Sequence, residues 1–408
     1  MGMIHYLKRK KSFCLNKKDN MAKRKKKKIN FLKLFKVILL IINIICAFGL
    51  FLTFIGQFIK PSTSFIIALS GLGFRYLLVI NLFFVFFWLF IRFKISILSL
   101  VLILININNI DKYFQLNASP KPESCVNCVK VMSYNVRLFG LYNHNNPRDR
   151  QIHKQEILDY LSKENPDIVC FQEFFYDRSG KLNFNTLDTI LSLLNVKDEN
   201  YYYTYFPYNR KNEFFYGFAT ISKYRIVNNG VVLLPDSHTV AATFVDFKYK
   251  GDTIRNYNVH LASNYFNPID DQTSKQILEG SQYDSTINSR AKLVLKKMKV
   301  AILKREVEAQ YIKKHIEESP YKVIVCGDLN DPPFSYAYHQ ISSGLKDSFR
   351  ESGQGQGNTY NGSIYPSFRI DNIFHSPQFK SYGHTVSRDI DISDHFPVYC
   401  YISLLKDR

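Results

Sequence analysis

One apolar run in the sequence is followed by a carboxylate side chain and a carboxamide side chain that stand two positions apart. The stretch Tyr321–Pro333 has the sequence Y-K-V-I-V-C-G-D-L-N-D-P-P. Its apolar part, Val323–Cys326, predicts a buried strand that Gly327 ends and the two prolines prevent from continuing. Asp328 and Asn330 would then stand at the carboxyl end of a strand, where ligands bind in α/β sheets. An Asx-rich turn, favoured for local reasons, is the alternative.

Other predicted strands end in polar residues of the same kind. These strand-end residues are Asn135, Glu173 and His260, and two further segments add Asp371 in R-I-D-N and Asp394 with His395 in S-D-H. Carboxylates and amides without thiolates suit a hard cation such as Mg²⁺ or Mn²⁺, and the histidines suit contact with an anion or proton transfer. The combination predicts metal-assisted attack of water on a phosphoester.

Each of these residues also has a purely structural interpretation. Asn135 or Glu173 alone could bond to loop backbone, His260 could be a satisfied structural histidine, and Asp371 could pair with Arg369. Structural roles alone do not readily explain why all of these segments carry residues suited to the same chemistry. We therefore favour a site.

The elements that must position these residues are those of an α/β domain. Strands are predicted at 129–135, 167–173, 217–222, 231–234, 241–249, 253–260, 322–326, 369–375 and 398–404. Helices are predicted at 150–164, 186–194, 290–318 and 336–342, and loops at 264–285 and 353–362.

The first 110 residues have a different character. A basic tail, 1–36, is predicted to be disordered, and Met1 and Met21 are both candidate starts. Residues 37–110 predict an α-helical transmembrane region with helices at about 37–59, 65–91 and 95–110. The first of these has 23 residues and no charge, whereas the third spans only marginally.

Basic residues predict how this region is oriented. The 14 Lys and Arg before Val37 place the N-terminus in the cytoplasm. Three crossings would put the C-terminal part outside the cytoplasm, and failure of the third to cross would leave it inside. Of the total net charge of +20, only +3 falls on residues 113–408, so composition gives no support for strong binding to nucleic-acid backbones.

A linker, residues 111–128, joins this region to the α/β domain and contains Cys125 and Cys128. A structural zinc site needs four ligands, and the sequence has no second pair. We expect two unrelated thiols, with a redox or disulfide pair as the alternative. Cys170, Cys326 and Cys400 lie in apolar runs and are predicted to be buried free thiols.

The ordered motifs of residues 129–408 resemble one known superfamily. They are M-S-Y-N-V-R, P-D-I-V-C-F-Q-E, N-V-H-L-A-S, V-C-G-D-L-N-D, F-R-I-D-N-I-F and S-D-H-F-P-V. This set resembles the endonuclease/exonuclease/phosphatase superfamily, with its deoxyribonuclease I-like fold. The resemblance implies a four-layered sandwich of two packed mixed β-sheets flanked by helices. The apolar segments ahead of it look like those of membrane-anchored bacterial members, which implies the inner membrane.

The resemblance also implies roles for the site residues. Glu173 would be the principal ligand of Mg²⁺ or Mn²⁺, supported by Asn135 and Asp394. Asp328 would orient or deprotonate water, and Asn330 would hold the phosphoryl group. His260 and His395 would contact phosphate oxygens, with His395 oriented by Asp371. Asn372 replaces the family's usual aromatic residue, which puts substrate contacts in doubt.

The expected function is a membrane-anchored, metal-dependent phosphoesterase that cleaves a phosphodiester of nucleic acid or phospholipid. Its expected partners are the lipid bilayer and the phosphoester substrate, and no obligate protein partner is evident. The alternatives are a phosphomonoesterase of the inositol-phosphate phosphatase type and a catalytically silent, membrane-tethered binding module. The Lys296–Arg305 cluster favours a nuclease unless it is a solvated helix face.

Overall fold

The computed structural model describes most of the chain. The described residues are 31–117, 125, 127–141, 146–197, 199–207, 213–235, 239–264, 285–362 and 368–405. Most of the predicted basic tail and of the predicted loop 264–285 lies outside these residues.

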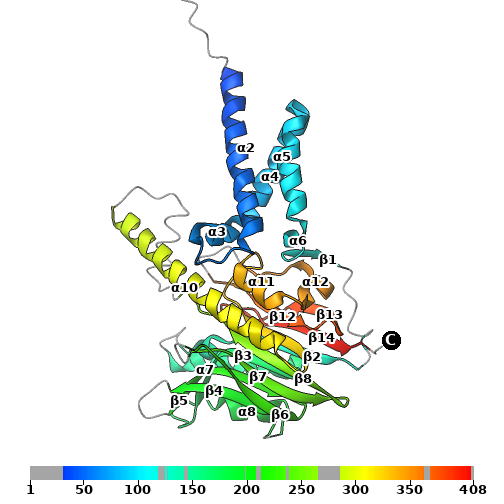
Figure 1. Cartoon of the computed structure of the whole chain (residues 1–408). Helices are drawn as coiled ribbons and strands as arrows, with labels where there is room; N and C mark the ends of the chain where they lie inside the picture. The colour runs from blue at the N-terminus through cyan, green and yellow to red at the C-terminus, as the bar shows by residue number, and fades with distance from the viewer. Residues whose placement is uncertain are drawn as a thin grey trace, which may run out of the picture.

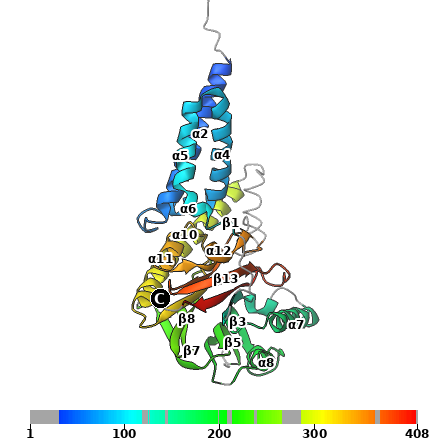
Figure 2. The same cartoon turned by 90° about the vertical axis from the view of Figure 1, so that its right-hand side faces the viewer.

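Residues 31–110 form a group of helices that we call the apolar bundle (Figures 1 and 2). Its elements are α2 (Phe31–Gly56), α3 (Phe65–Ser70), η1 (Gly71–Gly73), α4 (Phe74–Ile91), α5 (Phe93–Ile105) and α6 (Ile107–Ile110). Two stretches, Phe31–Gly56 and Phe65–Ile91, are long and apolar enough to cross a membrane, with mean hydropathies of 2.8 and 2.2. Helix α5 has 13 residues, about 20 Å, and is therefore shorter than a bilayer core.

Polar side chains inside the apolar bundle bind one another. Asn43 donates to Ser99 over 2.7 Å, and Ser99 donates to Asn81 over 2.9 Å. The outer surface instead exposes large apolar side chains, including Phe83 and Phe86, each more than half exposed. Large exposed apolar surfaces of this kind mark sites of contact with another protein or with a membrane.

Two six-stranded sheets make up the remainder of the fold. Sheet I has the strand order β13-β14-β2-β3-β5-β4, and sheet II has the order β10-β12-β9-β8-β7-β6. The strands of sheet I are β2 (Val129–Asn135), β3 (Ile168–Asp177), β4 (Tyr201–Pro207), β5 (Phe214–Ser222), β13 (Phe379–Val386) and β14 (Val398–Leu404). Those of sheet II are β6 (Ile226–Leu233), β7 (Val240–Tyr249), β8 (Asp252–His260), β9 (Lys322–Asp328), β10 (Lys346–Asp347) and β12 (Asp371–His375).

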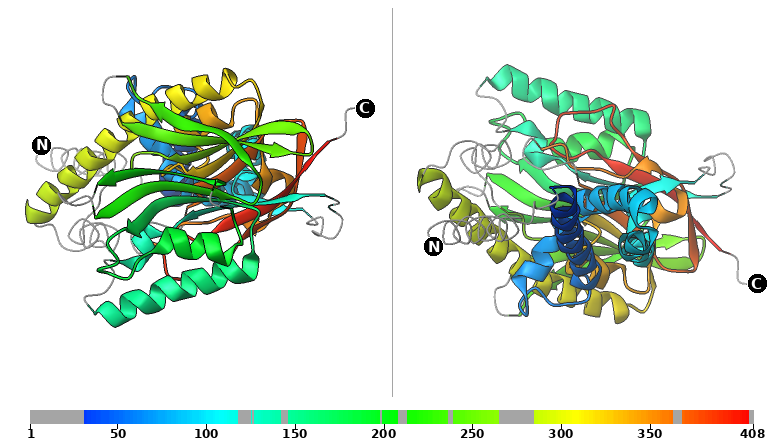
Figure 3. Two further views of the ribbon diagram at one scale, coloured as in Figure 1. Left: turned by 90° about the horizontal axis from the view of Figure 1, so that it is seen from below. Right: turned by 90° about the horizontal axis from the view of Figure 1, so that it is seen from above.

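Helices cover the outer face of each sheet, which gives four layers (Figure 3). On sheet I they are α7 (Pro147–Glu164) and α8 (Thr186–Leu193), with the short η3 (Arg137–Gly140) nearby. On sheet II they are α10 (Ser285–Glu317) and α11 (Tyr336–Ser342), and α12 (Ser348–Ser352) packs against β12 and β13. The predicted four-layered sandwich of two mixed sheets is therefore confirmed.

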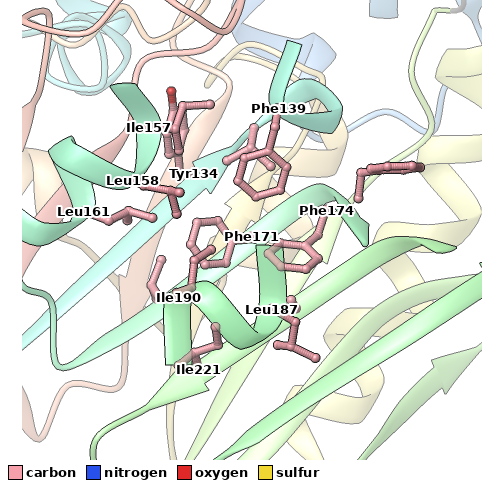
Figure 4. Close-up of a cluster of buried hydrophobic side chains, with 14 of the residues drawn as sticks. Tyr134, Phe139, Ile157, Leu158, Leu161, Phe171, Phe174, Leu187, Ile190 and Ile221 are labelled. Carbon is pink, nitrogen blue, oxygen red and sulfur yellow. The ribbon is translucent and has the colours of Figure 1, made fainter. Parts of the chain in front are cut away.

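Aromatic and aliphatic side chains fill the space between sheet I and its helices. Figure 4 shows Phe171 and Phe174 of β3 among Leu158 of α7 and Leu187 and Ile190 of α8. All five are at most 3% exposed. Burial of each such side chain is worth about 1.5–3 kcal/mol, so this layer holds sheet I in place.

Successive side chains of a strand point to opposite faces, and this alternation places the polar side chains at the strand ends in the space between the two sheets. Val131 of β2 and Cys326 of β9 belong to the same inter-sheet core. Asn135 follows Val131 by four residues and Asp328 follows Cys326 by two, so both side chains lie on the inter-sheet faces. Each sheet has one parallel pair, β2 with β3 and β8 with β9. The carboxyl ends of both pairs carry the predicted site.

The apolar bundle packs directly onto the sandwich. The backbone and hydroxyl groups of Ser62 donate to the Glu306 carboxylate of α10 over 2.7 and 2.8 Å. The rings of Phe74 in α4 and Phe334, which follows β9, lie 4.0 Å apart between centroids. These contacts, of which the Phe74–Phe334 pair is buried, fix the bundle relative to sheet II.

A small two-stranded sheet adds a second connection. Strand β1 (Phe114–Leu116), in the predicted linker, pairs antiparallel with β11 (Gln354–Gln356). The prediction of a loop throughout 353–362 is therefore wrong, because β11 is stabilised by a partner that lies far away in sequence.

The two linker cysteines are joined. Cys125 and Cys128 form a disulfide, so the expectation of two unrelated thiols is wrong. Cys170, Cys326 and Cys400 are buried free thiols, as predicted. A thiol in an apolar core behaves as a small hydrophobic group.

Candidate active site

The carboxyl ends of the two parallel pairs meet at one end of the sandwich. Strand register places Asn135 opposite Gln172, and His260 opposite Asp328. Asp371 begins β12 and also lies opposite Asp328. The structure brings together all the predicted site residues, which are Asn135, Glu173, His260, Asp328, Asn330, Asp371, Asp394 and His395.

Asp328 is the centre of this arrangement. Its carboxylate is fully buried and accepts a hydrogen bond from the Asn135 amide over 3.1 Å. The Nε2 atoms of His260 and His395 lie 3.7 and 3.6 Å from its Oδ2 atom. Within the described part of the chain, no hydrogen bond reaches the buried Nε2 of His260. Amide and imidazole nitrogens therefore surround this buried carboxylate.

A tight turn follows Asp328 and places Asn330 beside it. The backbone amide of Asn330 donates to Asp328 Oδ1 over 2.8 Å, and the Asn330 side chain contacts Oδ2 over 3.3 Å. Gly327 has a φ of +154°, and a Cβ there would meet the Val259 carbonyl oxygen at 2.0 Å. Only glycine therefore permits this approach of β9 to β8.

An irregularity in β3 turns Glu173 toward the site. The pairing of β3 with β5 shifts between Phe171 and Phe174, and Glu173 has a φ of +50°. Its Oε1 atom lies 3.3 Å from the Asn135 amide nitrogen and 3.7 Å from His260 Nε2. The strand continues to Asp177, beyond the end predicted at residue 173. Strained bulges of this kind concentrate at functional sites.

His395 forms a buried dyad with Asp371. Its Nδ1 lies 2.9 Å from Asp371 Oδ2, and both side chains are almost fully buried. Burial by itself lowers the pKa of His395, but the carboxylates of Asp371 and Asp328 outweigh it and raise that pKa well above its usual value. The dyad therefore keeps a charged imidazole beside Asp328.

Arg137 is a cationic group that our sequence analysis did not select. Its guanidinium lies 3.3 Å from Asp394 Oδ2 and is about half exposed in the cavity over the site. It follows Asn135 by two residues in M-S-Y-N-V-R. This position, two residues after a predicted metal ligand, was the sequence signal that could have identified Arg137. A guanidinium here suits a phosphate oxygen.

Buried polar groups also position the site residues from behind. Gln172 donates to the Asn258 side chain over 2.7 Å and so links sheet I to sheet II beside Glu173 and His260. The Thr359 hydroxyl accepts from the backbone amide of Asp371 over 3.0 Å. Thr359 lies in the segment 353–362 that was predicted as a loop, and nothing in its local sequence signals this role.

The structure also shows the contacts of three other residues, which the sequence analysis had left open. Arg369 pairs with Asp347 over 2.6 Å rather than with Asp371. Arg305 is 2% exposed and contacts Asp331, so this member of the basic cluster does not belong to a solvated helix face. Asn372 is buried and donates to the Ile370 carbonyl. It is absent from the cavity lining described below.

A cavity of about 1230 Å³ opens over the site. The site residues that line it are Glu173, His260, Asn330, Asp394 and His395, and Arg137 lies at its wall. Asp328, Asp371 and His395 also present ligand atoms within 4.8 Å of one another, a spacing that a metal ion could bridge. The arrangement combines acidic, amide and cationic groups around a space large enough for a substrate.

Sequence comparison gives the family. Residues 132–395 match the endonuclease/exonuclease/phosphatase family. The match covers more than half of the chain, and the chain belongs to this family. It is accordingly a hydrolase that acts on ester bonds. A profile for a domain of unknown function matches residues 35–113, and no curated protein sequence matches the chain.

Solved structures with a similar fold share little sequence with this chain. An endonuclease/exonuclease/phosphatase from Beutenbergia cavernae is 17% identical, with 69% of this chain and 72% of that one covered and a TM-score of 0.48. A family protein from Leptotrichia buccalis is 17% identical, covering 68% and 100%, with a TM-score of 0.44. The human Nocturnin catalytic domain with bound sulfate is 18% identical, covering 68% and 93%, with a TM-score of 0.44.

Proposed function

We propose that this chain is a membrane-anchored, divalent-metal-dependent phosphodiesterase in which a water molecule attacks phosphorus. The observation that carries the proposal is the fully buried Asp328 carboxylate, which has Asn135 and Asn330 within hydrogen-bonding distance and His260 and His395 close by. A proton acceptor set between groups that can bind an anion is the arrangement that phosphoester hydrolysis requires.

Glu173, Asn135 and Asp394 are the proposed metal ligands, and their oxygen donors fit Mg²⁺ or Mn²⁺. Glu173 supports this choice because its carboxylate is 35% exposed and lines the cavity. Asp371 and His395 bind each other instead, and a protonated imidazole has no lone pair to offer a cation. The bound ion would neutralise negative charge that develops on the phosphate.

The side chains of this chain perform the remaining steps. Asp328 orients the water and accepts its proton, and Asn330 holds the phosphoryl group beside it. The charged imidazole of His395 contacts phosphate oxygens, as does the Nε2 of His260, which no hydrogen bond reaches within the described residues. Burial of Asp328 strengthens each of these interactions because little water screens them.

The test uses the full-length chain in detergent micelles. We expect hydrolysis of bis(4-nitrophenyl) phosphate in Mg²⁺ or Mn²⁺, loss of that activity with a chelator, and slower hydrolysis of 4-nitrophenyl phosphate. Faster cleavage of the monoester would favour a phosphomonoesterase. A folded protein that cleaves neither ester would favour the binding module.

Replacement of Asp371 by asparagine should shift the pH dependence of activity. Without the carboxylate the pKa of His395 falls, so its charged form is lost at a lower pH than in the wild type. The alkaline limb of kcat/KM should therefore move to lower pH, and the deficit relative to wild type should shrink on acidification. Asp391→Asn, at an exposed acid nearby, is the control. An equal deficit at every pH would assign Asp371 a purely structural role.

We also propose that the apolar bundle anchors the chain in the bacterial inner membrane by three crossings, the third made by α5 together with α6 because α5 alone is too short. Helices α2, α4 and α5 run side by side, away from the sandwich (Figure 2). The basic residues before Val37 favour a cytoplasmic N-terminus. The Cys125–Cys128 disulfide favours an oxidising compartment for the catalytic domain.

This orientation predicts that position 119 is accessible from outside the cytoplasm. A cysteine introduced at Ser119 should react with a membrane-impermeant thiol reagent in cells with a permeabilised outer membrane and an intact inner membrane. Protection of this cysteine until lysis would place the catalytic domain in the cytoplasm.

A further inference from the structure

We infer that the substrate is a phosphodiester carried by a membrane lipid and that the apolar wall of the cavity holds its acyl chains. This inference rests on the proposed phosphodiesterase function of the same site. It narrows the substrate from any phosphodiester to one that is embedded in a bilayer.

The cavity connects the site to the apolar bundle. Its lining extends from Glu173 and His395 to Ala68, Gly71 and Leu72 of α3 and η1. Phe334, whose ring packs on Phe74 of the bundle, follows Asp328 by six positions in the chain. The cavity therefore gives a lipid beside the bundle a path to the site.

The second wall of the cavity is a run of apolar side chains from α10. They are Met298, Val300, Ile302, Leu303 and Val307, and the charged Lys304, Arg305 and Glu308 of the same helix also line the cavity. Nucleic acid would place charged phosphates and polar sugars against this wall and leave its apolar area without a matching partner. An acyl chain removes that area from water, which stabilises the complex by roughly 25 cal/mol per Å².

The outer surface of α10 has the composition of a helix that lies at a membrane surface. Leu293 and Leu295 are 49% and 45% exposed, and Lys292 and Lys296 lie beside them in the sequence. Exposed apolar side chains mixed with lysines suit the headgroup region of a bilayer that contains anionic lipids.

The orientation of α10 agrees with this placement. Figure 1 shows α10 rising from the sandwich toward the level of α3, at the base of the apolar bundle. The contact of Ser62 with Glu306 holds the middle of α10 against the bundle. The net charge of only +3 on residues 113–408 also argues against a nucleic-acid substrate.

The first experiment compares one phosphodiester with and without acyl chains. Full-length protein is reconstituted in vesicles of phosphatidylethanolamine and phosphatidylglycerol with Mg²⁺, and the release of headgroup or phosphate products is measured. Soluble comparators are glycerophosphoglycerol, bis(4-nitrophenyl) phosphate, duplex DNA and RNA. We expect kcat/KM for the lipid to exceed that for glycerophosphoglycerol by about tenfold or more.

The outcomes separate the two proposals. Metal-dependent cleavage of bis(4-nitrophenyl) phosphate without cleavage of either lipid overturns the lipid inference and leaves the phosphodiesterase function standing. Faster cleavage of DNA or RNA than of lipid does the same. Cleavage of no diester by the folded protein overturns both.

The second experiment changes the cavity wall. Leu72→Asp and Val300→Asp should each lower lipid hydrolysis about tenfold relative to hydrolysis of bis(4-nitrophenyl) phosphate, because a charge in an acyl-chain site is costly. Val300 is 48% exposed, so its substitution should be tolerated in folding. The matched control is Val227→Asp, at an exposed valine of β6 outside the cavity lining. An unchanged ratio of lipid to soluble activity in both cavity variants would overturn the inference.

Discussion

Asp328→Asn should lower phosphodiester turnover by about three orders of magnitude while the protein stays folded. The amide has nearly the same shape as the carboxylate, and its oxygen can still accept the hydrogen bond from the Asn330 backbone. It cannot accept a proton from water, and it carries no charge to hold the imidazoles of His260 and His395. The effect should therefore appear mainly in kcat.

The matched control for this substitution is Asp252→Asn. Asp252 begins β8, at the opposite end of the parallel pair from Asp328, and forms a partly exposed ion pair with Lys322 over 3.3 Å. Partly exposed pairs contribute little to stability, so this variant should keep both fold and turnover. Near-normal turnover in Asp328→Asn, with folding verified by circular dichroism and thermal unfolding, would remove Asp328 from the mechanism.

Glu173→Gln should lower turnover at a fixed Mg²⁺ concentration by about two to three orders of magnitude and weaken metal binding. Glu173 is the proposed ligand that a bulge turns into the cavity. A neutral amide is a weaker ligand for a hard cation than a carboxylate. Mn²⁺ binding measured by electron paramagnetic resonance reports this loss independently of activity.

Glu156→Gln, at an exposed glutamate on α7, is the matched control and should leave Mn²⁺ binding unchanged. The same titration distinguishes the two possible metal sites. If Glu173→Gln binds Mn²⁺ normally and Asp371→Asn does not, the ion belongs to the group of Asp328, Asp371 and His395.

The sequence predicted the strand ends of the site because their signals are local. Alternation along Val129–Asn135 and the apolar run before Asp328 both determine which faces are buried. These two patterns also placed the residues at the ends of parallel strands, where the structure has them. The family motifs supplied the order of the segments and hence the two-sheet fold.

The features that the sequence missed depend on distant partners. Strand β11 forms because β1, more than 200 residues earlier, pairs with it. Strand β4, in the tyrosine-rich stretch Tyr201–Pro207, has no clear alternation to reveal it. The positive φ of Glu173 reflects the pairing of β3 with β5 and has no signature in P-D-I-V-C-F-Q-E. Such features are tertiary and override local preference.

The division of the site between the sheets has a consequence for folding kinetics. Sheet I contributes Asn135 and Glu173, whereas sheet II contributes His260 and Asp328. The Gln172–Asn258 hydrogen bond forms only when the two sheets face each other. An intermediate with both sheets formed but undocked has native secondary structure and no assembled centre. Regain of hydrolysis during refolding therefore reports when the two sheets dock, whereas far-ultraviolet circular dichroism reports when the strands form.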